Sequence, residues 1–117
     1  MGQLTTHILD IMSGKPAAGV KVEVFAVDGD GRERLAMAVT NQDGRCEKPL
    51  LADSAFGAGT YELLFHVGDY FAAGGAAQSE PPFLDVVPVR FCVADAERDY
   101  HVPLLVSAYA YSTYRGS

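Results

Sequence analysis

The 117-residue sequence contains no tryptophan, only two cysteines and only nine basic residues. Two cysteines, Cys46 and Cys92, exclude a disulfide scaffold, and neither has the neighbouring ligands of a zinc site. We expect two reduced thiols, buried or half-buried, as in a cytoplasmic protein. Nine lysines and arginines against 15 acidic residues give a net charge of −6. This balance argues against nucleic acid or an anionic membrane as a partner, because both need clustered positive charge.

Long apolar runs are also absent. No stretch approaches the roughly 18 consecutive apolar residues of a membrane span. Residues 1–7 lack the basic and apolar regions of a secretory signal, so we expect a cytoplasmic protein without a membrane partner. Apolar residues make up 49% of the chain and charged residues 21%, which are ordinary globular values. The length fits one domain, and we predict a single domain over residues 1–117.

The sequence is rich in short segments in which apolar and polar residues alternate, the pattern of half-buried strands. Turn residues separate these segments at 28–31 and 41–44, and a short helix is predicted at 69–73, ended by Gly74 and Gly75. We therefore predict an all-β fold, an antiparallel β-sandwich of seven to eight strands with one short helix. The predicted inward faces are Val20/Val22/Val24/Ala26, Leu35/Met37/Val39, Tyr61/Leu63/Phe65/Val67, Val87/Val89/Phe91/Val93 and Val102/Leu104/Val106.

The last predicted strand is apolar on both faces. If Val102, Leu104 and Val106 point inward, the alternation turns Pro103 and Leu105 outward. Exposed tyrosines, which are enriched at interfaces, follow at 109, 111 and 114. We therefore expect another subunit to cover this face.

Common catalytic signatures are missing: the sequence has no Gly-x-Ser-x-Gly elbow, phosphate loop or dinucleotide fingerprint. Two histidines, His7 and His101, lie on the faces opposite the predicted core. Together they have the chemistry to hold and deprotonate a water molecule. The alternative is that each is simply hydrogen-bonded on its strand, since spacing does not show that they meet. The other candidates also have non-functional interpretations. Arg45 is ordinarily a solvent-exposed residue at the start of a strand, and residues 114–117 are ordinarily a frayed tail. His66 is expected to be a surface residue.

The same residues carry a family resemblance that covers residues 4–117. Leu-Thr-Thr-His-Ile-Leu-Asp at 4–10, followed by Gly-Lys-Pro-Ala at 14–17, resembles the N-terminal signature of the 5-hydroxyisourate hydrolases, the transthyretin-like enzymes of urate degradation. Further blocks match at 40–45, 83–91 and 100–105, and the final Tyr-Arg-Gly-Ser resembles the family's characteristic C-terminus. The terminal tetrapeptide, in register, is the most specific element.

The resemblance implies an eight-stranded transthyretin-like sandwich with one short helix. It also implies a homotetramer whose sites lie at subunit interfaces, in a central channel. The implied catalytic residues are His7, Arg45 and His101, and the implied substrate-binding residues are Tyr114, Arg115, Gly116 and Ser117. Ala108 and Ala110 depart from the proline and glycine common in the family, which affects the expected bend before the tail.

The implied reaction is hydrolysis of 5-hydroxyisourate to 2-oxo-4-hydroxy-4-carboxy-5-ureidoimidazoline, by water attack that opens the N1–C6 bond of the six-membered ring. No metal and no cofactor are expected, because the substrate carbonyl belongs to an activated ring amide. The competing hypothesis is a transthyretin-type carrier of small hydrophobic ligands without catalysis. Such a carrier is expected to line its channel with apolar residues and to lack the motif residues, so the chemistry of the site decides between the two.

Overall fold

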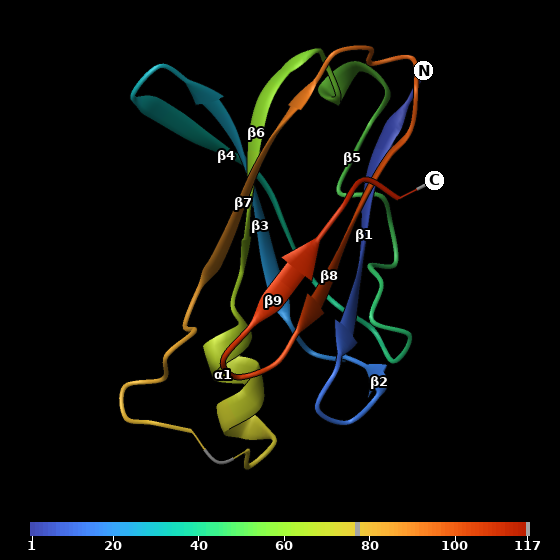
Figure 1. Ribbon diagram of the computed structural model, residues 1–117. Helices are drawn as coiled ribbons and strands as arrows, with labels where there is room; N and C mark the ends of the chain where they lie inside the picture. Colours follow the sequence, from blue (N-terminus) through green and yellow to red (C-terminus); the bar gives the residue numbers. More distant parts are fainter. Residues whose placement is uncertain (77, 117) are drawn as a thin grey trace.

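The computed structural model describes residues 1–76 and 78–116, which form two facing sheets with a helix at one end (Figure 1). In the first sheet the strand order is β2-β1-β8-β9, and β5 also pairs with β1. In the second sheet the order is β4-β3-β6-β7. The bounds are β1 Gln3–Asp10, β2 Lys15–Pro16, β3 Lys21–Asp28, β4 Gly31–Val39, β5 Leu51–Ala52, β6 Gly59–Phe65, β7 Val87–Val93, β8 Tyr100–Val106 and β9 Tyr111–Thr113. A 3₁₀ turn spans Asp53–Ala55, and the helix α1 spans Val67–Ala73.

The predicted β-sandwich is confirmed, and most neighbouring strands are antiparallel. The exception is β1, which pairs with β8 in parallel over seven residue pairs. Alternation alone does not distinguish parallel from antiparallel pairing, because it reports only which side chains share a face. The parallel pair matters for function because it places two distant parts of the chain side by side along their full length.

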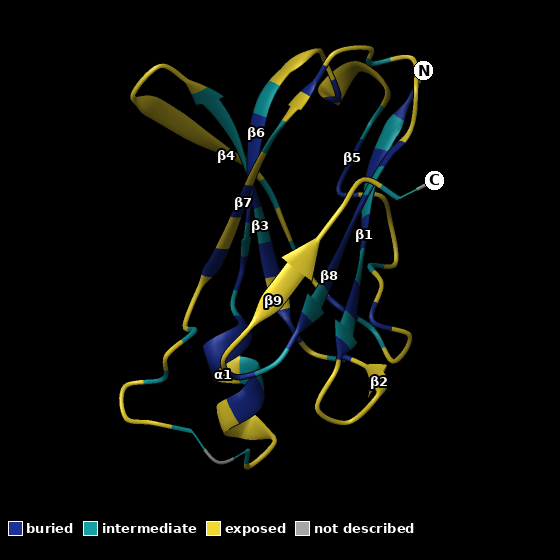
Figure 2. Cartoon of the chain, viewed as in Figure 1, coloured by how far each residue is buried: buried dark blue, intermediate teal, exposed yellow. Residues whose placement is uncertain are grey.

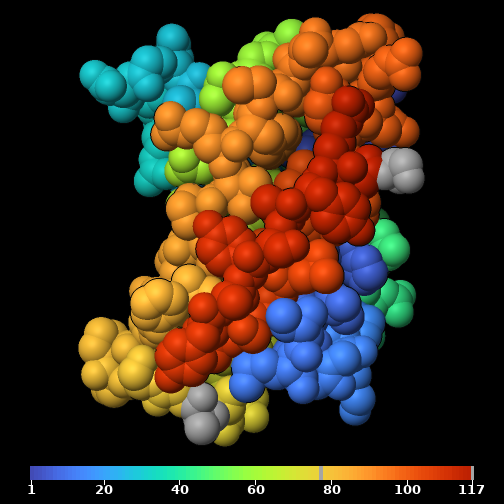
Figure 3. Space-filling view, viewed as in Figure 1, coloured from blue at the N-terminus to red at the C-terminus, as the bar shows by residue number. Residues whose placement is uncertain are grey.

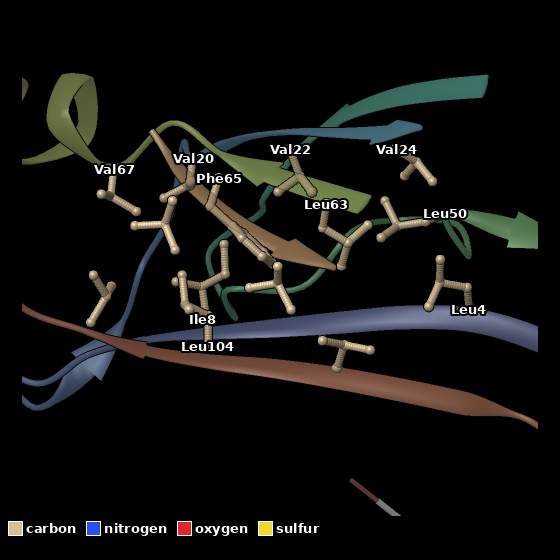
Figure 4. Packing of buried hydrophobic residues seen from close by; sticks show 14 of the residues in the cluster. Leu4, Ile8, Val20, Val22, Val24, Leu50, Leu63, Phe65, Val67 and Leu104 are labelled. Carbon is tan, nitrogen blue, oxygen red and sulfur yellow. The ribbon is translucent and has the colours of Figure 1, made fainter. Parts of the chain in front are cut away.

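The core lies between the two sheets and is built from the inward residues that alternation predicts on most strands (Figure 4). Leu4 and Ile8 of β1 meet Val22 of β3 and Leu63 and Phe65 of β6, and all five side chains are fully buried. Burying an aliphatic or aromatic side chain of this size contributes about 1.5–3 kcal/mol, so the core fixes the inward faces. The opposite faces of β1 and β8 are then free to carry the histidines.

The helix closes one end of the sandwich (Figure 1) and ends before Gly74, as predicted. Its start differs from the prediction, since Val67 is its first residue and not the last of a strand. Val67 is nevertheless fully buried, because the first helical turn packs against the same core. A buried residue after an alternating run fits either element, which explains the error.

The prediction for β4 is wrong. Leu35, Met37 and Val39 are exposed, whereas Ala36 and Ala38 pack against the core. A β-bulge shifts the register opposite the junction of Val24 and Phe25, so the pairing of β3 with β4 skips Leu35. Because β4 is an edge strand, its larger side chains lie outside the sandwich without disturbing the core.

The outward face of β8 is only partly exposed. His101 and Leu105 are half-buried, and Pro103 is buried. The C-terminal strand β9 pairs with β8 and is exposed along its length (Figure 2).

Both cysteines are free thiols, but only Cys46 is half-buried as expected, whereas Cys92 is exposed. Among the described residues, no helix has the length and apolar character that a membrane crossing needs.

Candidate active site

The candidate site is built on the outward face of the β1–β8 pair. In the parallel register Thr5 lies opposite His101, and His7 lies opposite Pro103. Because Thr5, His7 and His101 share this outward face, the two histidines are brought to one area of the sheet from positions 94 residues apart in sequence. Both side chains are half-buried. The structure thus brings together the two histidines that the sequence singles out.

Arg45 reaches the same area from the turn that precedes it. The side-chain oxygen of Asn41 accepts hydrogen bonds from the amides of Asp43 and Arg45, at 2.9 and 3.2 Å. The turn is fastened to β1 because the Ile8 amide donates to the Gly44 carbonyl at 2.9 Å. Gly44 has φ +73°, and a Cβ there would lie 2.5 Å from the Ile8 carbonyl oxygen. Arg45 then forms an isolated β-bridge with His7.

The C-terminal segment crosses the face of the molecule (Figure 3). Its Gly116 forms an isolated β-bridge with His101. The Thr113 hydroxyl donates to the Pro103 carbonyl at 2.7 Å, and the Gly116 amide donates to the His101 carbonyl at 2.7 Å. A Cβ on Gly116 would lie only 2.7 Å from Cδ2 of the His101 ring. Glycine at this position therefore allows the tail to lie against the imidazole.

The other tail residues lie differently. The Arg115 guanidinium stacks 3.9 Å above the Tyr100 ring and donates to the Asp99 carbonyl at 3.4 Å. Tyr114 is 58% exposed. Ser117, the fourth predicted substrate-binding residue, lies outside the described residues. Within the subunit, therefore, Arg115 anchors the tail and Gly116 contacts the histidine.

An open cleft of about 330 Å³ is lined by Gln3, Thr5, Arg45, Asp99 and His101. A larger cleft of about 750 Å³ lies beside α1 and is lined by residues such as Asp10, Lys15 and Tyr70. The larger cleft contains none of the predicted site residues, so size alone does not identify the site. We assign the site to the smaller cleft because it holds the basic and titratable groups that face one another.

Electrostatics keep both histidines neutral near pH 7. Burial and the nearby positive charge of Arg45 lower the pKa of His7 below 6.5, although the Asp43 carbonyl and carboxylate partly oppose this. Burial, Arg45 and His7 together lower the pKa of His101 below 6.5. A neutral imidazole has a lone pair that can accept a proton, so the site contains two bases beside one fixed cation.

His101 makes one further contact, between its Nδ1 and the Thr5 hydroxyl at 2.8 Å. Sequence analysis did not single out Thr5 or Asp99. Thr5 could have been identified as a candidate because alternation places it on the same outward face as His7. Within the described part of the chain, no group of three or more histidine, cysteine, aspartate or glutamate residues is arranged to hold a metal ion.

The sequence matches the HIUase/Transthyretin family over residues 4–116. The chain belongs to this family. The 5-hydroxyisourate hydrolase of Halalkalibacterium halodurans is 56% identical over 99% of this chain and 98% of its own length. The structure of Klebsiella pneumoniae 5-hydroxyisourate hydrolase superposes with a TM-score of 0.82 at 36% identity, covering all of both chains. Sea bream transthyretin in complex with thyroxine has a TM-score of 0.87 at 30% identity, covering 97% of this chain and 94% of that one.

Membership confirms the transthyretin-like fold and the resemblance on which the site residues were selected. The family contains both hydrolases and transthyretins, so the fold is compatible with catalysis or with carriage. The chemistry of the cleft distinguishes the two, because its lining includes Arg45 and His101 rather than apolar side chains alone, and His7 forms a β-bridge with Arg45 beside it.

Proposed function

We propose that this chain hydrolyses 5-hydroxyisourate to 2-oxo-4-hydroxy-4-carboxy-5-ureidoimidazoline at the cleft between Arg45 and His101. Hydrolases of this substrate are full-length relatives of the chain at 52% and 56% identity. One observation carries the assignment of the site. Two histidines with lowered pKa values and an arginine without a carboxylate partner among the described residues lie together on one outward sheet face. This is a set of groups suited to activating water and binding an electron-rich ring.

The histidines supply the base. One neutral imidazole takes a proton from water as the water oxygen attacks C6, and the second orients that water. The N1–C6 bond then breaks, N1 receives a proton, and the new carboxyl group retains the oxygen of water. A positioned acid or base typically accelerates such a step about 10²–10⁴-fold.

Arg45 supplies positive charge. Its guanidinium binds the ring oxygens and stabilises the negative charge that develops on the attacked carbonyl. Gly116 lies against the His101 ring, and the proposed role of residues 114–117 is to bind the substrate from this side. Arg115 holds the tail in place through its contacts with Tyr100 and Asp99.

The assembly is a homotetramer with the sites at subunit interfaces. This is supported by exposed aromatic side chains near the β9 edge, where Phe83 and Tyr109 stack at 6.0 Å and Tyr111 is 43% exposed. Such clusters are typical of covered surfaces.

Residues 1–117 act as one hydrolase domain, since buried residues of both sheets form one cluster. Two free thiols favour a cytoplasmic location.

A carrier function is the alternative, because sea bream transthyretin, which shares the fold, was solved in complex with thyroxine. The half-buried histidines and Arg45 oppose it, because a hydrophobic ligand leaves these polar groups without partners.

Ultraviolet absorbance of freshly oxidised urate tests the function directly. Adding the protein is expected to accelerate the decay of 5-hydroxyisourate. Light scattering of the same active protein is expected to give the mass of a tetramer. Decay at the uncatalysed rate would reject the hydrolase, and a fully active monomer would reject the interface sites.

A further inference from the structure

We propose that Thr5 is a positioning residue that fixes the His101 imidazole in the tautomer with a proton on Nδ1 and a free lone pair on Nε2. The proposal rests on the proposed hydrolysis and extends it, because it assigns the reactive atom of one histidine. It begins from a single contact, the 2.8 Å separation of the Thr5 hydroxyl and His101 Nδ1.

The contact is a consequence of the fold. Thr5 and His101 are direct partners in the parallel β1–β8 register, on the outward face. Neighbouring strands hold such pairs about 5 Å apart, which allows a threonine hydroxyl to reach Nδ1 of an imidazole. In the part of the chain that the structure describes, Nδ1 has no other hydrogen-bond partner.

The ring is fixed from its other side as well. Gly116 approaches Cδ2, the carbon next to Nε2, so closely that a Cβ there would lie 2.7 Å away. The imidazole is thus held between a hydroxyl at one edge and the tail backbone at the other. This arrangement restricts rotation of the ring and orients Nε2.

A hydroxyl that accepts from Nδ1 is useful in both states of a catalytic cycle. Neutral His101 then has its proton on Nδ1, and Nε2 is available as the base. When Nε2 takes a proton, the Nδ1–H donation to Thr5 remains, so the ring need not turn. If Thr5 instead donated to Nδ1, protonating the ring at that atom would break the bond.

Three titratable or charged side chains surround His101, each on a different segment of the chain. His7 lies on β1, Arg45 lies after the 41–44 turn, and Asp99 lies in the loop before β8. Removing the Thr5 hydroxyl leaves these groups in place. A change in the tautomer of His101 would therefore report the lost hydrogen bond.

The test compares Thr5→Val with Thr5→Ser. Valine keeps the branched shape that suits a strand but has no acceptor, and serine restores the hydroxyl. Thr6→Val is the matched control, because the Thr6 hydroxyl donates to the Val102 carbonyl at 2.7 Å on the buried face of the same strand. We expect Thr5→Val to lower kcat about 10- to 100-fold, part of the 10²–10⁴ contributed by a positioned base, with KM changed less than about threefold. Thr5→Ser and Thr6→Val should remain within about threefold of the wild type in kcat.

Nitrogen-15 spectra of the histidine ring provide a readout that does not depend on activity. The wild-type chain and Thr5→Ser should show His101 protonated on Nδ1, and Thr5→Val should show a mixture or the other tautomer. An unchanged tautomer with unchanged kcat in Thr5→Val would overturn the proposal, as would a Thr5→Ser variant as impaired as Thr5→Val. If the wild-type chain failed to hydrolyse 5-hydroxyisourate while the spectra changed as expected, the proposed function would be rejected but not the role of Thr5.

Discussion

The outer faces of the two sheets carry similar residues in opposite electrostatic settings. On the β3–β6 face, Glu23 contacts His66 Nε2 at 2.6 Å and Arg34 at 3.1 Å. Glu62 is buried between two more arginines, Arg32 at 2.7 Å and Arg90 at 3.1 Å. On the β1–β8 face, no carboxylate of a described residue forms an ion pair with His7, His101 or Arg45.

The difference separates structural from functional use of the same side chains. Where each cation has a carboxylate, the charges are mutually satisfied and the groups hold neighbouring strands together. Where half-buried histidines lie near an arginine that forms no ion pair with a carboxylate of the described residues, burial and the positive charge disfavour their charged forms, and the arginine keeps its capacity to bind an anion. The second arrangement is the one expected of an active site.

The largest expected effect comes from replacing residues on the β1–β8 face. His7→Asn, His101→Asn and Arg45→Gln should each lower kcat/KM about 10²–10⁴-fold while leaving the fold intact, because none of them lies in the core. Steady-state kinetics measure the loss, and circular dichroism and sedimentation measure fold and assembly. His66→Asn and Arg34→Gln are the controls on the other face, and their activity should stay close to that of the wild type. Equal losses on both faces would remove the distinction between them.

The next effect concerns the tail. Deleting residues 114–117 should abolish most of the activity without unfolding the domain, since residues 114–116 lie outside the core. A tag appended after Ser117 should impair hydrolysis more than the same tag before Met1. Gly116→Ala should also impair hydrolysis, because the added Cβ would collide with the His101 ring. Equal kinetics in all these forms would show that residues 114–117 behave as an ordinary frayed end.

A smaller effect is expected in the pH dependence. Because burial, and then the charge of Arg45, lower the pKa values of His7 and His101, kcat/KM should hold its plateau from neutral pH to below 6.5 and then fall as the histidines take up protons. Removing the cation in Arg45→Gln should move both pKa values upward, toward 6.5. Proton NMR titration of the rings measures this even in an inactive variant. Arg90→Gln, on the opposite face, should leave both titrations unchanged, and an identical shift in the two variants would contradict a local effect.

The comparison also shows what the sequence could predict. Alternation assigned His7 and His101 to faces opposite the core, and the core then fixed those faces. The meeting of the two histidines depends on the parallel register of β1 and β8, a pairing between distant segments that no local pattern encodes. The family resemblance supplied that information.

Errors arose where local patterns have two readings. Leu35, Met37 and Val39 alternate like an inward face, but the register pairs Ala36 and Ala38 with the buried Val24 and Val22, so the larger side chains of β4 lie outside. His66 was expected to be a surface residue, yet it is a half-buried partner of Glu23. Thr5 was missed because threonine is common in strands, and its role depends on the residue opposite.

The smallest expected effect concerns the stability provided by the β3–β6 face. Hydrogen bonds from His66 and then Arg34 lower the pKa of Glu23 below 4.5. A lowered carboxyl pKa stabilises the fold above the unfolded value, and this contribution is lost as the pH falls from about 4.5 through the folded value. Because Arg34 is more than half exposed, we expect Glu23→Gln to cost only about 1 kcal/mol at pH 7. The cost should shrink toward zero well below pH 4, where the carboxyl group is protonated. Urea unfolding at fixed protein concentration measures both values, with Glu33→Gln, an exposed position on β4, as the control. A cost that is the same at both pH values would mean that Glu23 contributes through packing and not through its charge.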